Sequence, residues 1–397
     1  MRRLGWMVGL GAAALLAAGS LPPEAEAQGA TRFRKHMIAF GIPAVSAAVA
    51  DFNGDGRPDV AAASEDEVAW YDRGGGKSFW ARTLVHRRTE RTGSLATDWL
   101  LAHDLDGDGD LDLITHSPVS GNLAWFENPG AGAAADDSGW TWRLIDNLPG
   151  VRGHALEDLN RDGRPELIAN YEGAIAWYPV PRNPQSLLSA NYVGDPAGRA
   201  KWDRHYLARS GASGRTHYLS FADMDGDGDR DLLTGASQGG YLAWWERPAD
   251  ATLLWTKRVV REELPGATHL LAADLDGDKK AELVYSLGGA KSIGWLGGAP
   301  DWEREGTIDD GWLVKPHTVV LADLDGDGDL DLAAASLESR TAWWENDGKG
   351  RFTRRDLDAS QAGSDLRAVD VDGDGDLDLV LAGGRSKNLV WFENLRR

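Results

Sequence analysis

The sequence predicts an all-β fold made from one unit repeated seven times, and three observations support this prediction. An acidic loop such as ADLDGDGDLDL at 322–332 returns seven times along the 397 residues. A tryptophan follows the first aspartate of every loop after 19 to 21 residues. The two ends of the chain carry complementary pieces of the same unit. A fixed internal period of this kind indicates a repeat architecture and not two or three independent domains.

The acidic loops have the composition of calcium sites. In the loop at 323–331, positions one, three, five and nine are aspartates, and glycines at positions four and six permit a tight backbone path. Oxygen ligands without imidazole or thiolate favour Ca²⁺, with Mg²⁺ or Mn²⁺ as alternatives. The first six positions resemble an EF-hand loop. The flanking segments are expected to be strands, so position nine is predicted to take the closing role of position twelve.

We therefore predict up to seven Ca²⁺ ions. The predicted ligands are Asp51, Asn53, Asp55 and Asp59 in the first loop; Asp104, Asp106, Asp108 and Asp112 in the second; Asp158, Asn160, Asp162 and Glu166 in the third; Asp223, Asp225, Asp227 and Asp231 in the fourth; Asp274, Asp276, Asp278 and Glu282 in the fifth; Asp323, Asp325, Asp327 and Asp331 in the sixth; and Asp370, Asp372, Asp374 and Asp378 in the seventh.

Two loops depart from this pattern. The third has Arg161 where the others have glycine, and the fifth has Lys279 in place of the glycine at position six. We expect these two to be the weakest sites. Since secreted modules often bind Ca²⁺ with Kd values of ~10⁻⁴ to 10⁻³ M, the ions are expected to act as structural staples and not as sensors.

The composition agrees with this interpretation. The formal net charge is -20, and seven bound Ca²⁺ would bring it to about -6, an ordinary value for a soluble domain. No stripe of Lys and Arg is visible, which argues against a nucleic-acid partner. The chain has no cysteine, so disulfides and thiolate metal sites are excluded.

The N-terminal residues have the features of a signal peptide. Arg2 and Arg3 precede an apolar stretch at 4–18, and Ala-Glu-Ala at 25–27 offers a cleavage site. The apolar stretch is short for a membrane anchor, and glycines interrupt it. We predict that residues 1–27 are removed, by Sec or twin-arginine export. The mature chain, 28–397, is then secreted or periplasmic, with no membrane span.

Each repeat is long enough for four short strands. In the sixth repeat we expect strands at 318–322, 332–335, 342–346 and 351–357. The third strand of each repeat carries one tryptophan. In chain order these are Trp70, Trp125, Trp177, Trp244, Trp295, Trp343 and Trp391. We interpret this row as packing between repeats, with a stacking surface for sugars or bases as the alternative. A proline-rich insertion is predicted at about 179–200.

The ends of the chain predict a closed ring. The last repeat stops after its third strand at 392–394, while TRFRKHMI at 31–38 matches the fourth-strand phrase RFTRRDL at 351–357. If the N-terminal strand completes the last sheet, no sheet edge at the joint is left exposed. We therefore predict a seven-bladed β-propeller in which three strands from one terminus pair with one from the other.

The motifs also carry a family resemblance. The DxDGDGxxDL loops together with the WFEN strand resemble the FG-GAP/VCBS-type repeats of secreted bacterial proteins, which share their calcium-loop propeller with integrin α heads and some fungal lectins. The resemblance covers nearly the whole mature chain and implies the fold and calcium binding. It does not imply one function, because the scaffold hosts unrelated activities. The propeller of aldos-2-ulose dehydratase, a metal-dependent sugar lyase, is similar in architecture.

A candidate ligand site lies at the start of the first strand of each repeat, near the mouth of the central channel. Four histidines precede the loop aspartates of four consecutive repeats by four to six residues; they are His154, His217, His269 and His317. Asp98 and Arg152 occupy similar places. Converging imidazoles can bind a transition metal or act as acid and base. Alternatively each histidine only packs at the rim, with His269, at minus five, on the opposite side of its strand from the two at minus six.

Two functions are compatible with these observations. The first is a secreted, calcium-stabilised propeller that binds a carbohydrate or another extracellular ligand at the channel mouth. No nucleophile elbow, phosphate loop or zinc-protease helix motif occurs in the sequence. The second is a metal-dependent sugar lyase or dehydratase in which the histidines hold a divalent metal and Asp98 or Arg152 assists proton transfer.

Overall fold

A computed structural model describes the residues 33–74, 79–90, 92–93, 95, 97, 99–130, 139–182, 184, 202–209, 214–250 and 252–396. The predicted signal peptide, Asp98 and most of the predicted insertion lie outside these residues. The strand before the insertion ends at Tyr178 and the next one begins at His205.

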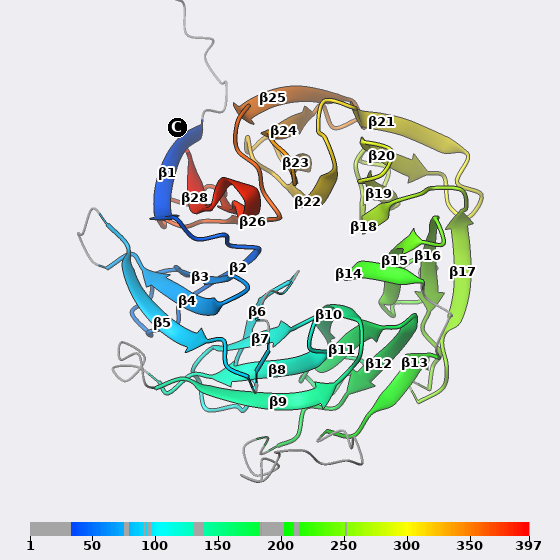
Figure 1. Cartoon of the computed structure of the whole chain (residues 1–397). Helices are drawn as coiled ribbons and strands as arrows, with labels where there is room; N and C mark the ends of the chain where they lie inside the picture. Colours follow the sequence, from blue (N-terminus) through cyan, green and yellow to red (C-terminus); the bar gives the residue numbers. More distant parts are fainter. Residues whose placement is uncertain are drawn as a thin grey trace, which may run out of the picture. The chain divides into compact units, whose positions relative to one another are not determined.

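Twenty-eight strands form seven antiparallel sheets of four strands each in the described residues, and the sheets are arranged as blades around a ring (Figure 1). Blade 1 has β2 (Ser46–Ala50), β3 (Asp59–Ala63), β4 (Glu67–Asp72) and β5 (Ala81–Arg87); blade 2 has β6 (Leu101–His103), β7 (Asp112–His116), β8 (Asn122–Glu127) and β9 (Thr141–Asn147); blade 3 has β10 (Val151–Glu157), β11 (Glu166–Tyr171), β12 (Ala174–Tyr178) and β13 (His205–Ala208); blade 4 has β14 (Arg215–Ala222), β15 (Asp231–Gln238), β16 (Tyr241–Glu246) and β17 (Thr256–Arg261).

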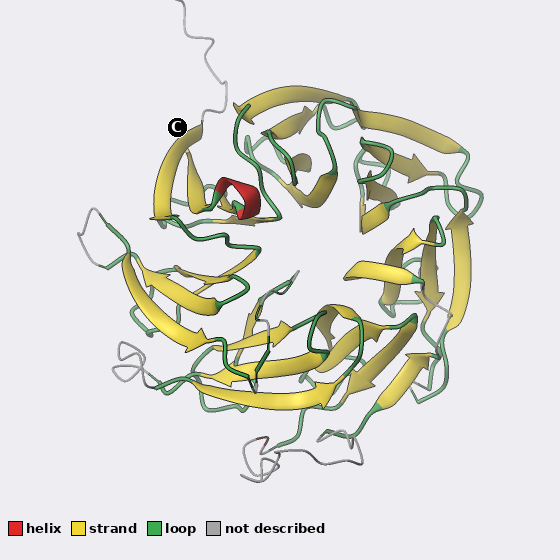
Figure 2. Cartoon of the chain, viewed as in Figure 1, coloured by secondary structure: helices red, strands yellow, loops and turns green. Residues whose placement is uncertain are grey.

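The remaining blades have the same order. Blade 5 has β18 (Ala267–Ala273), β19 (Glu282–Leu287), β20 (Ser292–Gly297) and β21 (Arg304–Asp310); blade 6 has β22 (Pro316–Ala322), β23 (Asp331–Ser336), β24 (Thr341–Asn346) and β25 (Phe352–Asp358); blade 7 has β26 (Asp365–Val369), β27 (Asp378–Ala382), β28 (Asn388–Asn394) and β1 (Phe33–Phe40). A single turn of 3-10 helix, η2 (Gly384–Ser386), precedes β28, and loops and turns join the strands (Figure 2).

Blade 7 closes the ring as predicted. β1 runs antiparallel to β28, with Phe33 opposite Asn394 and Phe40 opposite Asn388. The ring of His36 on β1 stacks on Trp391 of β28 at 4.5 Å between centroids. The joint between the two ends of the chain is therefore part of a regular sheet, which confirms the seven-bladed β-propeller and its closure.

The hydrophobic cores lie between neighbouring blades. Trp70 of blade 1 packs in one cluster with Leu113 and Phe126 of blade 2, and Trp125 of blade 2 packs with Tyr178 of blade 3. The repeated tryptophans are buried in five blades, whereas Trp244 and Trp295 are half-buried. The prediction of packing between repeats is thus confirmed, and blades 4 and 5 differ from the others.

Candidate functional site

The acidic loops connect the first and second strands of the blades and gather their carboxylates. Five loops each bring three carboxylate oxygens within 4.8 Å of one another. These groups are Asp104, Asp106 and Asp108; Asp223, Asp225 and Asp231; Asp274, Asp276 and Glu282; Asp323, Asp325 and Asp331; and Asp370, Asp372 and Asp374. Each group can hold a metal ion. Calcium remains the predicted ion because all donors are oxygens.

Backbone amides hold the loop in shape. In the sixth loop the carboxylate of Asp323 accepts hydrogen bonds from the amides of Gly326, at 2.6 Å, and Gly328, at 3.2 Å. The glycines at these positions have positive φ, for example 74° at Gly326. Arg161 and Lys279, which replace such glycines, adopt φ of 60° and 67°. The turn is therefore kept in the two unusual loops, at a cost in backbone strain of about 1 to 2 kcal/mol per residue.

The carboxylate at position nine has a structural role besides any role as a ligand. Asp331 is buried, and its two oxygens accept hydrogen bonds from the amides of Leu324, at 3.0 Å, and Asn346, at 2.8 Å. It thereby ties its own loop to β24. Burial raises the pKa of Asp331 to about 7 and that of Asp59 to about 8. A nearby cation favours the charged form of such buried carboxylates, so the residues present fit a bound divalent ion.

The predicted histidines do not form one group. His154 on β10 is buried, and its Nδ1 lies 2.8 Å from Nδ1 of His116 on β7. His217 on β14 and His317 on β22 are half-buried, with ring centroids 6.2 Å apart. His269 on β18 is buried, and its Nδ1 accepts a hydrogen bond from the amide of Val319 at 3.3 Å. Among the described residues, the groups of three or more His, Asp or Glu close enough to hold one ion all lie in the acidic loops.

The histidines are instead parts of a side-chain network on the axis of the ring. Tyr218 of blade 4 stacks on His269 of blade 5, with ring centroids 4.4 Å apart. Its ring centroid lies 5.1 Å from that of Trp99, which precedes the first strand of blade 2 in the chain. The Tyr218 hydroxyl lies 2.9 Å from Nδ1 of His317 in blade 6. Because blades 2, 4 and 6 are not neighbours, these side chains can meet only at the centre.

Arg367 of blade 7 completes this axial network. Its guanidinium lies 3.4 Å from the centroid of the Trp99 ring and donates to the buried carboxylate of Asp365 at 2.9 Å. Asp365 also accepts a hydrogen bond from the amide of Ala47 in blade 1, at 2.9 Å. Burial, with the neighbouring His317 and Arg367, lowers the pKa of His269 to about 3. The axis is therefore occupied by packed side chains, among them the neutral imidazole of His269.

On the face that carries the acidic loops, side chains join neighbouring blades. In five blades, the side chain of the residue three positions after the repeated tryptophan donates a hydrogen bond to a backbone carbonyl in the acidic loop of the preceding blade. The carbonyl belongs to the second residue of that loop. Asn394 reaches Leu324 at 2.7 Å, and Asn128 reaches Phe52 at 3.0 Å. The other such bonds in the described residues run from Arg73 to Val371, from Arg247 to Leu159, and from Asn346 to Leu275. We call each of these contacts an inter-blade clip.

Two blades have a residue that cannot make the clip, and a cavity lies at both junctions. Blade 5 has Gly298 at this position, and a cavity of about 1040 Å³ lies between blades 4 and 5. Blade 3 has Val180, which itself lines a cavity of about 670 Å³ between the loops of blades 2 and 3. Neither residue carries a side-chain donor. The two junctions without a clip are therefore both hollowed on the loop face.

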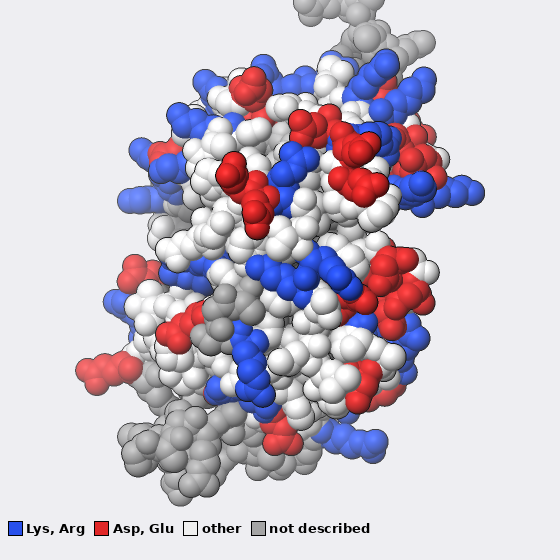
Figure 3. All heavy atoms as spheres, turned by 90° about the vertical axis from the view of Figure 1, so that its right-hand side faces the viewer, with Lys and Arg blue, Asp and Glu red and all other residues white. Residues whose placement is uncertain are grey.

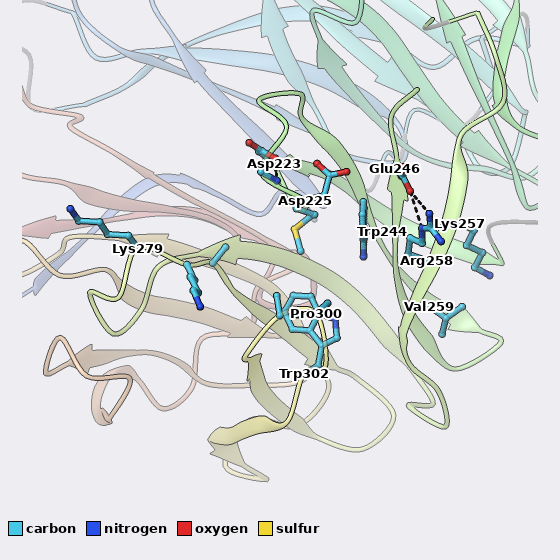
Figure 4. Close-up of a pocket in the computed structure, with 15 residues that line it drawn as sticks. Asp223, Asp225, Trp244, Glu246, Lys257, Arg258, Val259, Lys279, Pro300 and Trp302 are labelled. Atoms are coloured by element: carbon cyan, nitrogen blue, oxygen red, sulfur yellow. Dashed lines mark hydrogen bonds and ion pairs between the residues drawn. The ribbon is translucent and has the colours of Figure 1, made fainter. Parts of the chain in front are cut away.

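The cavity between blades 4 and 5 combines aromatic and ionisable groups. Figure 4 shows Trp244 and Glu246 on one side, Pro300 and Trp302 on another, and Lys279 on the fifth loop. The carboxylates of Asp223 and Asp225 from the fourth loop complete the lining. Glu246 accepts hydrogen bonds from Arg258, at 2.6 and 2.9 Å. A metal ion in the fourth loop would lie at the wall of this cavity.

Comparison with known proteins agrees with the fold and the loops. A model of the FG-GAP-like repeat matches residues 51–115, 104–169, 223–285 and 302–381. The chain belongs to the FG-GAP-like repeat family. No curated protein matches this FG-GAP-like chain.

Solved structures match the chain at low identity. A lectin of Agrocybe aegerita, described as recognising non-reducing terminal N-acetylglucosamine, is 17% identical, with a TM-score of 0.49 over 92% of this chain and 86% of its own. Two structures of BBS1N in complex with ARL6DN, one soaked with lead and one with mercury, have TM-scores of 0.54 and 0.56 at 11% and 9% identity. They cover 91% and 90% of this chain, and 96% and 95% of theirs.

Trp99 and Tyr218 of this FG-GAP-like propeller were not predicted as site residues from the sequence. Like the predicted His269, both precede their loop aspartate by five residues, and this shared spacing is the signal for contact at the axis. Arg152 was a candidate for proton transfer and lines a cavity of about 510 Å³ beside Glu172 and Arg215.

No helix in the described part of the chain is long and apolar enough to cross a membrane.

Proposed function

We propose that this FG-GAP-like propeller is an extracellular, calcium-stabilised module that binds a carbohydrate without transforming it, in the cavity between blades 4 and 5. The observation that supports this most directly is the half-buried indole of Trp244, which lines a cavity of about 1040 Å³ together with Trp302. An apolar sugar face packs well on an indole ring, while carboxylates and ammonium groups bond to hydroxyls.

The proposed site differs from the one expected from the sequence, which was the channel mouth. Trp99, Tyr218 and Arg367 occupy the axis, as described above. The junction between blades 4 and 5, which has no clip, offers a cavity for a ligand, whereas the axis is filled by side chains. The predicted signal peptide and the acidic loops support the extracellular, calcium-loaded state.

The charge around the cavity favours a neutral or mixed-charge ligand over a polyanion. Asp225 and Glu246 line the cavity together with Lys279 and Lys280. On the side of the ring that includes β17, acidic and basic side chains are interspersed (Figure 3). A nucleic acid would require a surface of one positive sign, whereas a sugar needs donors and acceptors close together.

The sugar-lyase alternative is not favoured by a specific observation. It depended on a metal shared by the predicted histidines, but His154 is buried against His116, and His269 is buried against Tyr218. Asp98, the other candidate for proton transfer, lies outside the described residues. We therefore propose the binding function alone.

A panel of immobilised neutral and acidic oligosaccharides, probed with the calcium-loaded protein, tests the proposal. Trp244→Ala should weaken binding of the recognised glycan at least tenfold. The matched control is Trp295→Ala, which removes the equivalent tryptophan of blade 5 outside the cavity. Absence of glycan binding by the folded wild type, or equal losses in the two variants, would contradict the proposal.

A further inference from the structure

The fifth acidic loop contains a cation supplied by the chain. The guanidinium of Arg304, the first residue of β21, lies within the loop's carboxylates. Its Nη1 donates to Asp276 at 2.5 Å, and its Nη2 donates to Glu282 at 2.7 Å and lies 3.5 Å from Asp278. Asp276 and Glu282 belong to the group of three that could otherwise hold a metal ion in this loop. Two of these three carboxylates are therefore already bonded to a positive charge.

A coordinated pair of sequence changes allows this contact. Arg304 stands opposite Gly297 in the β20–β21 ladder. In blades 2, 4 and 6 the same register pairs a glutamate with a threonine, in the pairs Glu127 and Thr141, Glu246 and Thr256, and Glu345 and Thr353. Blade 5 has thus lost an acid from its third strand and gained a base on its fourth.

The missing side chain at Gly297 makes the space for this arrangement. A Cβ atom there would lie 2.9 Å from Oε1 of Glu282 and 3.1 Å from Nη2 of Arg304. Both distances are shorter than an ordinary van der Waals contact. A glutamate at Gly297 would therefore be expected to displace the guanidinium from its present position.

In blades 2, 4 and 6 the third-strand glutamate adds negative charge near the loop. Burial is the main influence that raises the pKa of Asp106, Asp225 and Asp325, and the charges of Glu127, Glu246 and Glu345, respectively, raise it further. Blade 6 also has an arginine on its fourth strand, Arg355, but this arginine bonds to Glu345, at 2.6 Å. In blade 5 the corresponding fourth-strand position is Gly306, opposite Trp295.

We infer that Arg304 replaces the metal ion in the fifth loop, so that this loop is closed by an internal cation and binds no Ca²⁺. Lys279, at position six of the same loop, adds a second positive charge. A divalent ion would have to displace Arg304 from two carboxylates and would meet the repulsion of both cations. The inference rests on the proposed calcium loading of the other loops, and it limits the number of ions to six.

The test is the calcium content of the full chain, measured by elemental analysis after dialysis against a fixed free Ca²⁺ concentration of a few times the average Kd. The variant Arg304→Thr, which restores the residue of blades 2, 4 and 6, should gain one bound ion per chain. Adding Gly297→Glu should retain that ion and bind it more tightly. Arg261→Thr is the matched control, because Arg261 bonds to Glu305, at 2.9 Å, and not to the loop.

A second pair of variants separates failure of this inference from failure of the calcium proposal. Asp276→Asn in the fifth loop should leave the wild-type calcium content unchanged, whereas Asp325→Asn, at the same position of the sixth loop, should lower it by one. A loss of one ion in Asp276→Asn, or no gain in a folded Arg304→Thr protein, would overturn the inference. No loss in Asp325→Asn would instead overturn the calcium loading on which it rests.

Discussion

The side-chain amide of Asn394 donates a hydrogen bond of 2.7 Å to the backbone carbonyl of Leu324, and so joins the last blade to the acidic loop of the blade before it. The same amide donates to the carbonyl of Leu377 at 3.1 Å, and the side chain is buried. One asparagine therefore satisfies two carbonyls in two blades. The repeated WxEN phrase can be understood from this contact: the tryptophan fills the junction between blades, and the asparagine closes its rim.

We expect Asn394→Ala to destabilise the propeller by about 2 kcal/mol, because the buried carbonyl of Leu324 and the half-buried carbonyl of Leu377 lose their donor. Urea unfolding in saturating Ca²⁺ measures this change. Asn147→Ala serves as the control, since Asn147 is exposed and donates to Ser120 at 3.0 Å on the surface. Equal stabilities of the two variants would show that the clip contributes little to the junction.

Asp331 and Asp327 belong to the same loop but should respond differently to chelation. The two oxygens of Asp331 accept hydrogen bonds from two backbone amides, and in Asp331→Asn the side-chain NH₂ group would face one of these amides. We therefore expect the free energy of unfolding to fall by about 2 to 3 kcal/mol both in Ca²⁺ and in EDTA. Asp327 is exposed and accepts a hydrogen bond from the amide of Asp329 at 2.9 Å, a bond that the amide oxygen of an asparagine at this position can also accept. Asp327→Asn should therefore lower stability only in Ca²⁺.

The expected size of the calcium effect follows from mass action. For a Kd of ~10⁻⁴ M and ~2 mM free Ca²⁺, each occupied loop adds about 2 kcal/mol to the free energy of unfolding. Thermal unfolding of the two variants, with and without EDTA, measures the difference. If Asp327→Asn were as destabilising in EDTA as in Ca²⁺, the loop would not be acting through a metal ion.

The buried imidazole of His269 should make the protein sensitive to acid. Its pKa is about 3 in the folded protein and about 6.5 in an unfolded chain. The unfolded state therefore binds more protons as the pH falls below 6.5, and folding stability falls until the pH reaches about 3. At pH 5 the titration of His269 should therefore lower the free energy of unfolding by about 2 kcal/mol relative to pH 7 or above.

The variant His269→Asn tests this expectation, because an amide oxygen can accept the Val319 amide hydrogen as Nδ1 does. We expect its stability to fall less between pH 7 and pH 5 than that of the wild type, by about 2 kcal/mol. Chemical unfolding in EDTA at both pH values avoids the effect of pH on calcium binding. An identical fall in the two proteins would show that the imidazole titrates normally.

Much of the fold was predictable because the signals are local and repeated. Each loop places its carboxylates and glycines within nine residues, and the tryptophan follows at an almost constant spacing. Regular copies of this kind reinforce one another, whereas a single DxDGD segment would have been ambiguous. The pairing of β1 with β28 was predictable for a related reason: both strands had counterparts in complete repeats.

The candidate site was less predictable because it depends on contacts between blades. Histidines at minus four, minus five and minus six looked like one rim, but their partners come from other blades. His269 and His317, at minus five and minus six, both meet Tyr218 near the axis, while His154 meets His116 of the neighbouring blade. The partners Trp99, Tyr218 and Arg367 belong to three different repeats, and their meeting follows only from the closure of the ring.

The seven-fold repeat, the acidic loops and the closure of the ring can be read from the chain alone, because each depends on residues close together in the chain or on copies of them. What each loop faces depends on how the strands pair and the blades pack. Gly297 and Arg304 are seven residues apart, yet their effect on Glu282 appears only when β19, β20 and β21 are paired. Likewise, Gly298 becomes informative only beside the loop of the preceding blade, where a cavity lies at the junction that its missing side chain cannot bridge.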